Sequence, residues 1–202
     1  MKESAKEKSR NYFNEHQKSK LAKGGYWRHD YQFTLSAIGK IQPRRLIDIG
    51  CGAGAFLALV QEKYPEIQLN ALDQSEKMVE ETRERLTDTV IVTVGDAENM
   101  PLEKEQYQAA TCNMSIHHYP HPQKALCEMH RILMPEGYLL LNDMDCIAPI
   151  RWCANQVFPL LPGGDVKMYN RTEIIEMVRQ AGFQRIRYQK ISPFSFLCIA
   201  RK

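Results

Sequence analysis

Short apolar runs alternate with amphipathic stretches along most of the chain, and this alternation predicts β-strands that take turns with α-helices. Five runs are short and apolar enough to be buried strands: 45–49, 68–72, 90–94, 108–113 and 138–142. Helices are expected from Ala55, after Ser75 as N-cap, over 122–133, and over 172–181 with Thr172 as N-cap. Strands that alternate with helices pair in parallel through right-handed crossovers. The pattern therefore predicts an α/β fold, a three-layer α/β/α Rossmann-like sandwich.

Turn residues set several of the predicted boundaries. Pro135-Glu-Gly137 is expected to separate the fourth helix from the fifth strand, and Gly182 is expected to end the last helix. Two more strand-like runs, 185–191 and 194–200, are joined by Ser192-Pro193, which leaves no room for a crossover helix. These runs are expected to form an antiparallel hairpin at or near the sheet edge. The predicted sheet is thus seven-stranded and mostly parallel.

A single domain is expected for 202 residues of which 44% are hydrophobic. Its N-terminal part would hold a polar helix over 4–22 and, after Gly24-Gly25, an amphipathic helix from Trp27 to about Ile41. Within the domain 1–202 we expect four parts, which are N-terminal helices covering the site at 1–42, a ligand-binding core at 43–145, an irregular apolar insertion at 146–170, and a C-terminal helix and hairpin at 171–202.

Charge and composition exclude several classes of partner. The net charge of +3 is the small difference between 27 basic and 24 acidic residues, so no strong field is expected to recruit nucleic acid. No apolar stretch reaches the roughly 18 residues that span a bilayer, and a cytoplasmic monomer or homodimer without membrane insertion is expected. The six cysteines form no CxxC pair, which argues against a zinc site and a disulfide framework.

A glycine-rich loop follows the first predicted strand. Glycines in Gly50-Cys-Gly-Ala-Gly54 would let the backbone turn tightly and approach a ligand, while the following helix presents unpaired amides. The chain also satisfies Gly50-x-Gly52-x-x-Ala55, and Asp73 lies 19 residues beyond Gly54, where the ribose-binding acid of a dinucleotide site is expected. The loop alone therefore leaves two classes of nucleotide cofactor open.

Asp48 separates these two classes. A carboxylate at this position would repel the pyrophosphate of a dinucleotide. The run Leu46-Ile-Asp48-Ile-Gly50-Cys-Gly52-Ala-Gly54 resembles the first motif of class I S-adenosylmethionine-dependent methyltransferases, in particular the ubiquinone/menaquinone-methyltransferase-like type. In that family an acid stands two residues before the first glycine. The resemblance implies that Asp48 binds the ammonium group of S-adenosylmethionine, directly or through water.

Further motifs extend this resemblance over roughly residues 40–145. Asp73 aligns with the family's ribose-binding acid, Gly95-Asp96-Ala97 with its adenine-binding motif, and Asn113-Met-Ser-Ile-His117-His118 with the segment that closes the fourth strand. The resemblance leaves open which N-terminal aromatic residues cover the cofactor, among Tyr12, Phe13, Tyr26 and Trp27. The cofactor-binding residues that it implies are Asp48, Gly50, Cys51, Gly52, Gly54, Asp73, Gln74, Asp96, Ala97 and Asn113.

The chemistry of such a cofactor asks little of the protein. A sulfonium methyl group is already activated, so transfer is an in-line displacement that yields S-adenosylhomocysteine and requires no metal ion. A base helps when the acceptor must lose a proton, and histidine is suited to that near neutral pH. His117 and His118 follow the fourth strand at the edge where ligands of open α/β sheets bind, and they are the catalytic candidates. His121, between two prolines, is a weaker candidate.

The acceptor side is predicted from the segment after the fifth strand. Asp143 and Asp145 are expected to face the acceptor, although Asp143 suits a structural role at the strand end equally well. The insertion at 146–170 is expected to form part of a lid, in which Trp152 and Phe158 either line the acceptor or pack the lid onto the sheet. Its apolar character suits a small organic acceptor, methylated on carbon, oxygen or nitrogen, better than a nucleic-acid backbone. A protein or RNA acceptor, a non-catalytic S-adenosylmethionine-binding protein and a dinucleotide-dependent oxidoreductase are the alternatives.

Overall fold

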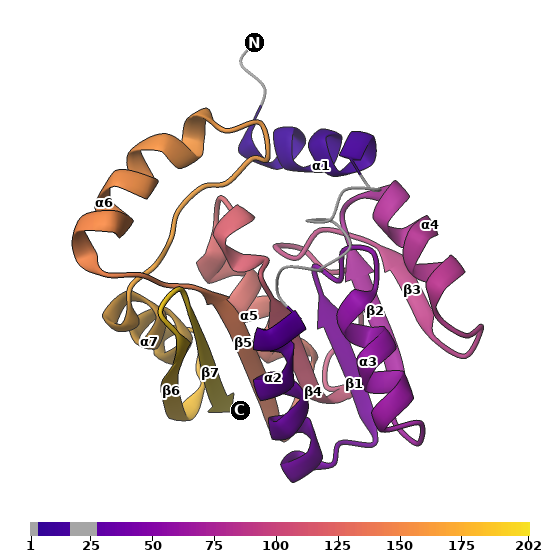
Figure 1. The fold of residues 1–202 in the computed structure, drawn as a ribbon. Coiled ribbons are helices and arrows are strands. Elements are labelled where there is room, and N and C mark those ends of the chain that lie inside the picture. The colour runs from indigo at the N-terminus through magenta and orange to yellow at the C-terminus, as the bar shows by residue number, and fades with distance from the viewer. Residues whose placement is uncertain (1–3, 17–27) are drawn as a thin grey trace.

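A single sheet forms the centre of the computed structural model, which describes residues 4–16 and 28–202 (Figure 1). The strand order is β3-β2-β1-β4-β5-β7-β6. β1 to β5 pair in parallel, whereas β7 is antiparallel to both β5 and β6. The strands are β1 Arg45–Ile49, β2 Gln68–Asp73, β3 Ile91–Val94, β4 Tyr107–Asn113, β5 Leu133–Met144, β6 Gln184–Ser192 and β7 Ser195–Arg201. The predicted mostly parallel sheet with an antiparallel C-terminal hairpin is confirmed.

Helices cover both faces of the sheet. Apolar residues of α2 and α3 pack on one face, where Leu46 of β1 joins them, and those of α5 and α7 pack on the other with Ile47. The three-layer sandwich is therefore confirmed. The helices are α1 Ala5–His16, α2 Arg28–Ile41, α3 Ala55–Lys63, α4 Glu76–Arg85, α5 Pro122–Ile132, α6 Ala148–Val157 and α7 Arg171–Gln180, with 3₁₀ turns η1 Ile116–His118 and η2 Phe158–Leu160. None of the helices in the described ranges is long and apolar enough to cross a membrane.

Two predicted boundaries are wrong. Pro135-Glu-Gly137 does not precede the fifth strand but lies inside β5, where Glu136 has a φ of 65° and the pairing with β4 shifts its register. The N-cap of α7 is Asn170 rather than Thr172. Its side chain accepts a hydrogen bond from the Glu173 amide while the Glu173 side chain accepts one from the Asn170 amide, and this capping box fixes the earlier start.

The segment after β5 is more ordered than an irregular insertion. It contains α6, whose residues are all at least partly exposed, and η2. α1 crosses the carboxyl end of the sheet beside the loop that follows η2 (Figure 1). A Cβ atom on Gly164 of that loop would lie 2.5 Å from the Ser9 amide nitrogen and 2.6 Å from the Ala5 carbonyl oxygen, so the two segments touch. The part of the predicted first helix at 17–22 lies outside the described residues.

Candidate functional site

A cavity of about 450 Å³ opens at the carboxyl ends of the parallel strands, under α1 and the loop after η2. This is the edge at which open α/β sheets bind ligands. Most of the predicted site residues line the cavity together: Asp48, Gly50, Cys51, Gly52, Asp73, Gln74, Asp96, Ala97, Asn113, His117 and His118. Gly54 does not line it. It instead caps α3 in the left-handed conformation, behind the loop.

The glycine loop between β1 and α3 is held against its neighbours by contacts that leave no room for a side chain. The amides of Gly50 and Cys51 both donate to the Leu72 carbonyl, at 2.8 and 3.1 Å. Gly50 has a φ of 71°, and a Cβ atom on it would lie 1.9 Å from the Ser115 hydroxyl oxygen. Glycine is therefore required at Gly50 both by the backbone conformation and by the close approach of Ser115.

Asp48 lies at the end of β1 and is 2% exposed. Its Oδ1 accepts hydrogen bonds from the Thr111 hydroxyl at 2.6 Å and from the side-chain amide of Asn113 at 3.2 Å. Among residues 4–16 and 28–202, no cation pairs with this carboxylate and no donor reaches its Oδ2. Burial raises the pKa of Asp48 to about 7 against the lowering effect of these two bonds. A cationic ligand group would be favoured at this carboxylate, which fits an ammonium ion.

Asn113, at the end of β4, connects Asp48 to the helix layer. The Asn142 side-chain amide donates to the Thr34 hydroxyl at 3.3 Å, and that hydroxyl donates to the side-chain oxygen of Asn113 at 3.2 Å. The Asn113 amide then donates to Asp48. This buried relay fixes the rotamer of the acid and ties α2 to the sheet.

Asp73 ends β2 next to the glycine loop. One of its carboxylate oxygens accepts from the Gly52 amide at 2.8 Å and the other accepts from the Ser75 amide at 2.9 Å. Burial raises the pKa of this carboxyl, and the backbone hydrogen bonds oppose the rise. Each oxygen keeps a further lone pair, so the carboxylate can accept from the two hydroxyls of a ribose as well.

Asp96 follows β3 and has a partner that the sequence did not indicate. Lys6 of α1 reaches its Oδ2 at 2.6 Å and Oε2 of Glu98 at 2.7 Å. The other Asp96 oxygen accepts from the Glu98 amide at 2.9 Å. Burial lowers the pKa of Lys6, but the two carboxylates outweigh it and the net shift is upward. The acid aligned with adenine binding therefore also anchors the helix that covers the cavity.

The two candidate catalytic histidines come from η1, directly after β4. His117 Nδ1 lies 2.6 Å from Asp143 Oδ1, and Asp143 Oδ2 accepts from the Ser115 backbone amide at 3.0 Å. Burial lowers the pKa of His117, but the charge and hydrogen bond of Asp143 outweigh it, so the net shift is upward. Burial and the neighbouring His117 hold the pKa of His118 well below its ordinary value.

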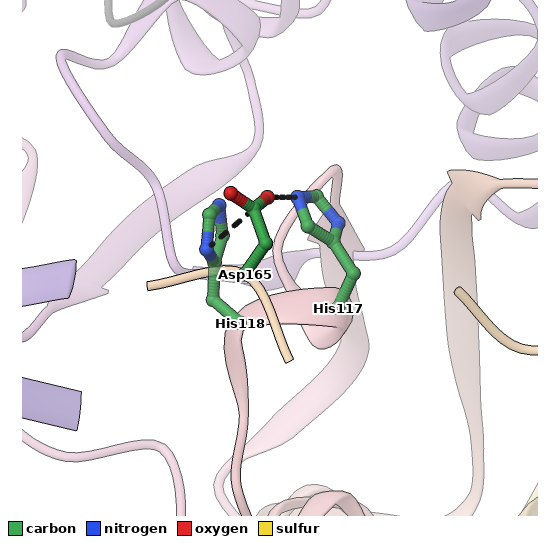
Figure 2. A group of neighbouring side chains, drawn as sticks. All are labelled: His117, His118 and Asp165. Carbon is green, nitrogen blue, oxygen red and sulfur yellow. Dashed lines mark ion pairs between the residues drawn. The ribbon is translucent and has the colours of Figure 1, made fainter. Parts of the chain in front are cut away.

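A residue from the insertion joins the histidines. Asp165, in the loop between η2 and α7, places Oδ1 3.6 Å from His117 Nε2 and 3.8 Å from His118 Nδ1 (Figure 2). Sequence reasoning missed Asp165 because 47 residues separate it from His118 and no local motif marks it. Asp143 was expected to face the acceptor, but it does not line the cavity and instead supports His117 from behind.

The other predicted residues divide into those that line the cavity and those that do not. Tyr12 and Phe13 of α1 and Phe158 line the cavity. His121, Asp145 and Trp152 do not: His121 is the N-cap of α5, Asp145 pairs with Arg151, and Trp152 is 67% exposed. Trp152 therefore contributes nothing to the cavity wall in this structure, and the lid over the acceptor stays a prediction. Tyr26 and Trp27 lie outside the described residues.

The chain is similar to known methyltransferases. A family model described as a methyltransferase domain matches residues 47–141. Demethylmenaquinone methyltransferase from Thermotoga maritima is 29% identical over 111 residues, which are 55% of this chain and 48% of that protein. The ubiquinone/menaquinone biosynthesis C-methyltransferase UbiE from Methylobacterium nodulans is 34% identical over 128 residues, 59% of this chain and 50% of that protein. The chain thus spans about half the length of these curated relatives.

The solved structures show the same fold. A SAM-dependent methyltransferase from Thermotoga maritima, described as a possible histamine N-methyltransferase, has a TM-score of 0.72 and 23% identity, with 96% of this chain and 98% of that chain covered. The family model and the curated relatives agree with the family predicted from the motifs, and with its cofactor, S-adenosylmethionine. The buried Asp48 carboxylate, at which a cation would be favoured, and the closely packed glycine loop both fit that cofactor. The chain is therefore similar to the class I S-adenosylmethionine-dependent methyltransferases, including the ubiquinone/menaquinone methyltransferases, over about half of its length.

Proposed function

We propose that this chain transfers a methyl group from S-adenosylmethionine, by in-line displacement, to a carbon, oxygen or nitrogen atom of a small organic acceptor. Bound S-adenosylmethionine supplies a methyl group that its sulfonium charge already activates. The observation that carries the proposal is that Asp48, Asp73 and Asp96 line one cavity together with His117 and His118. Three acids along three strand ends are spaced along one ligand, and the histidines lie beyond them.

The acids have separate roles in this proposal. Asp48 binds the ammonium group. Burial disfavours the ionised form of its carboxyl, and a bound cation offsets that effect. Asp73 accepts from the ribose hydroxyls while its backbone bonds hold it in place. Asp96 accepts from the adenine amino group, and the Ala97 amide reaches the ring. Gly50 and Gly52 let the backbone approach the ligand closely.

His117 and His118 face the acceptor in this proposal. The wall beside them includes Phe158, Leu161 and Pro162, which exclude water and favour an apolar molecule. Two relatives are named for demethylmenaquinone and for ubiquinone/menaquinone biosynthesis, and an apolar acceptor of that kind suits such a wall. The polar histidines would orient the atom that receives the methyl group, which is the requirement of an in-line transfer.

Two other functions are less well supported. A dinucleotide-dependent oxidoreductase would place a pyrophosphate against the glycine loop, where the Asp48 carboxylate would repel it. A non-catalytic S-adenosylmethionine-binding protein would use the same acids but would need no acceptor wall and no histidine pair. The apolar wall with the buried His117 and the largely buried His118 therefore favours a transferase.

Transfer of an isotopically labelled methyl group tests the proposal. The protein is incubated with methyl-labelled S-adenosylmethionine and a fractionated pool of small organic molecules, and label in the organic fraction is measured. Transfer that depends on the wild-type chain and falls at least tenfold in Asp73→Asn supports the proposal. Binding of S-adenosylhomocysteine without transfer to any fraction favours the non-catalytic alternative, and binding of NAD instead favours the oxidoreductase.

A further inference from the structure

His117, His118 and Asp165 form a cluster of three potential ligands at the acceptor side of the cavity. One ring nitrogen of each histidine and one oxygen of Asp165 all lie within 4.8 Å of one another. The Asp165 carboxylate lies between the two rings, with Oδ1 3.6 Å from His117 Nε2 and 3.8 Å from His118 Nδ1 (Figure 2). These separations are too long for hydrogen bonds. The three groups face one another without bonding directly.

The backbone fixes this arrangement. The amides of Val166 and Lys167 donate to the His117 carbonyl at 2.8 and 3.3 Å, so the loop that carries Asp165 is bound to η1. Gly164, one residue earlier, has a φ of 69° and packs against α1. The position of Asp165 opposite the histidines is therefore set by main-chain contacts on both sides.

His117 is oriented by a carboxylate on its other nitrogen. Its Nδ1 bonds to Asp143 at 2.6 Å, and this leaves Nε2 directed at Asp165. Histidines that bind metal ions almost always donate their second ring nitrogen to a carboxylate, a carbonyl or water, which fixes the tautomer and the ring orientation. Asp143 supplies this outer contact to His117.

His118 has a ring nitrogen with no partner. Nδ1 is buried and makes no hydrogen bond among the described residues, whereas the ring interacts with the backbone of Gly163 and Gly164. Those interactions fall to Nε2, because an imidazole has only two nitrogens. Nδ1 is then left with a lone pair that points at Asp165, and a buried acceptor without a partner costs about 1–3 kcal/mol.

The charges around the cluster also favour a cation. Asp143 and Asp165 carry two carboxylates, and the described residues offer Asp165 no lysine or arginine partner. Lys167, two residues away, pairs with Glu173 instead. A divalent ion would balance the two carboxylates and would give the His118 nitrogen a partner.

We propose that His117 Nε2, His118 Nδ1 and Asp165 bind one divalent transition-metal ion. Imidazole ligands favour zinc, cobalt, iron or nickel over magnesium and calcium. Ligand atoms about 2.0–2.2 Å from a tetrahedral ion are separated by about 3.3–3.6 Å, and the observed ligand atoms all lie within 4.8 Å of one another, so side-chain rotations complete the site. Three protein ligands leave a further position open, and the cavity lies on that side.

The open position gives the cluster a role in acceptor choice, a step that rests on the proposed function. The charge of the ion lowers the pKa of a hydroxyl or enol oxygen placed next to it. The acceptor then loses its proton to solvent before its nucleophilic atom forms a bond to the methyl carbon and the carbon–sulfur bond breaks. The acceptor class that this site would take is an apolar molecule with such an oxygen.

Metal binding is measured on the whole protein after treatment with EDTA and removal of the chelator. A Cys127→Ser/Cys153→Ser background removes the two exposed thiols, which could otherwise bind zinc. We expect one equivalent of Co²⁺ with the visible spectrum of nitrogen and oxygen ligands, displaced by Zn²⁺. His118→Ala and Asp165→Asn should each weaken binding at least tenfold, and Asp143→Asn should weaken it about 10–100-fold as an outer contact. His121→Ala is the matched control and should bind as the parent does.

The measurements distinguish failure of the metal site from failure of the proposed function. No binding of Co²⁺ or Zn²⁺ by the parent at micromolar concentration would overturn the inference, as would equal affinity in the parent, His118→Ala and Asp165→Asn. Circular dichroism checks that each variant is folded, and the parent spectrum tests the ligand set even where a variant fails to fold. Titration with S-adenosylhomocysteine is run in parallel. Cofactor binding without metal binding would reject the metal site and leave the proposed function standing.

Discussion

The ammonium of Lys6 lies 2.6 Å from a carboxylate oxygen of Asp96, 90 residues away in the chain. Through this pair and the one with Glu98, α1 is fastened to the loop after β3 across the mouth of the cavity. α1 also contributes Ser9, Tyr12 and Phe13 to the cavity wall. The helix that covers the site is therefore attached to the acid that we assign to adenine.

Lys6→Ala should accelerate release of S-adenosylhomocysteine. Both side chains of the pair are about one-third exposed, so the interaction is worth about 0.2–1 kcal/mol and the expected increase in dissociation rate is about 1.4- to fivefold. Stopped-flow displacement at low and high salt measures it, and the difference from wild type should shrink at high salt. Lys8→Ala on the same helix is the control. Identical dissociation rates in the two variants would show that Lys6 does not slow release of S-adenosylhomocysteine.

Cofactor affinity should depend on the ionisation of Asp48. In the free protein its pKa is about 7, and a bound ammonium lowers it, so the bound state holds fewer protons. Affinity should therefore be full above about pH 7 and should fall as the pH drops below it, by up to about tenfold per unit. Calorimetric titration with S-adenosylhomocysteine between about pH 5.5 and 8.5, roughly one and a half units either side of the pKa, measures this dependence.

Asp48→Asn supplies the control for that prediction. An amide has the shape of the carboxyl but does not ionise, so the variant should bind more weakly at high pH and show no slope near pH 7. A wild-type affinity that stays constant across the range would mean that the Asp48 carboxylate does not receive the ammonium group.

Asp73→Ala should weaken cofactor binding by about 1.5–3 kcal/mol, which is roughly 10- to 150-fold, because charge-assisted hydrogen bonds to the ribose are lost. The same change leaves the Gly52 and Ser75 amides without their acceptor, so part of the effect would come through the loop. Asp73→Asn keeps one acceptor oxygen and should be less severe. Calorimetry measures both variants, and unchanged affinity in a folded Asp73→Ala protein would defeat the ribose assignment.

Gly50→Ala should destabilise the fold as well as the site. The added Cβ atom would overlap the Ser115 hydroxyl, and the alanine would have to adopt a φ of 71°. The steric and backbone costs together are about 2–5 kcal/mol. Urea denaturation followed by circular dichroism measures the free energy of unfolding. Adding Ser115→Gly should recover only part of the steric cost, because the Cβ atom would still lie 2.9 Å from the Tyr119 hydroxyl oxygen. Full stability in the single variant would show that the loop is not packed as described.

The alternation of strands and helices could be predicted because it depends on periodicity within short segments. The same holds for Ser75, whose hydroxyl accepts from the Met78 amide at 3.1 Å as an N-cap does. Two N-cap residues close together were harder to separate. Asn170 and Thr172 both suit the position, and only the reciprocal bonds with Glu173 decide between them. α6 was missed since Pro149 reads as a breaker, although proline is compatible with a first helical turn.

The site was predictable only where a motif lies in one stretch of chain. Asp48, Gly50 and Gly52 belong to a single loop, and the carboxyl ends of neighbouring parallel strands bring Asp73 and Asp96 to the same edge. Lys6 and Asp165 could not be predicted, because each reaches the site through tertiary packing of a distant segment. Asp143 was expected at the acceptor for the related reason that its position near the end of β5 does not show which side of the histidine it occupies.

Calorimetric titration of the purified protein, stripped of any bound ligand, with S-adenosylhomocysteine and separately with NAD is the most direct test of the central claim. We expect the protein to bind S-adenosylhomocysteine at micromolar or lower concentration and to give no heat of binding with NAD. Binding of NAD, or the absence of S-adenosylhomocysteine binding by folded protein, would contradict it.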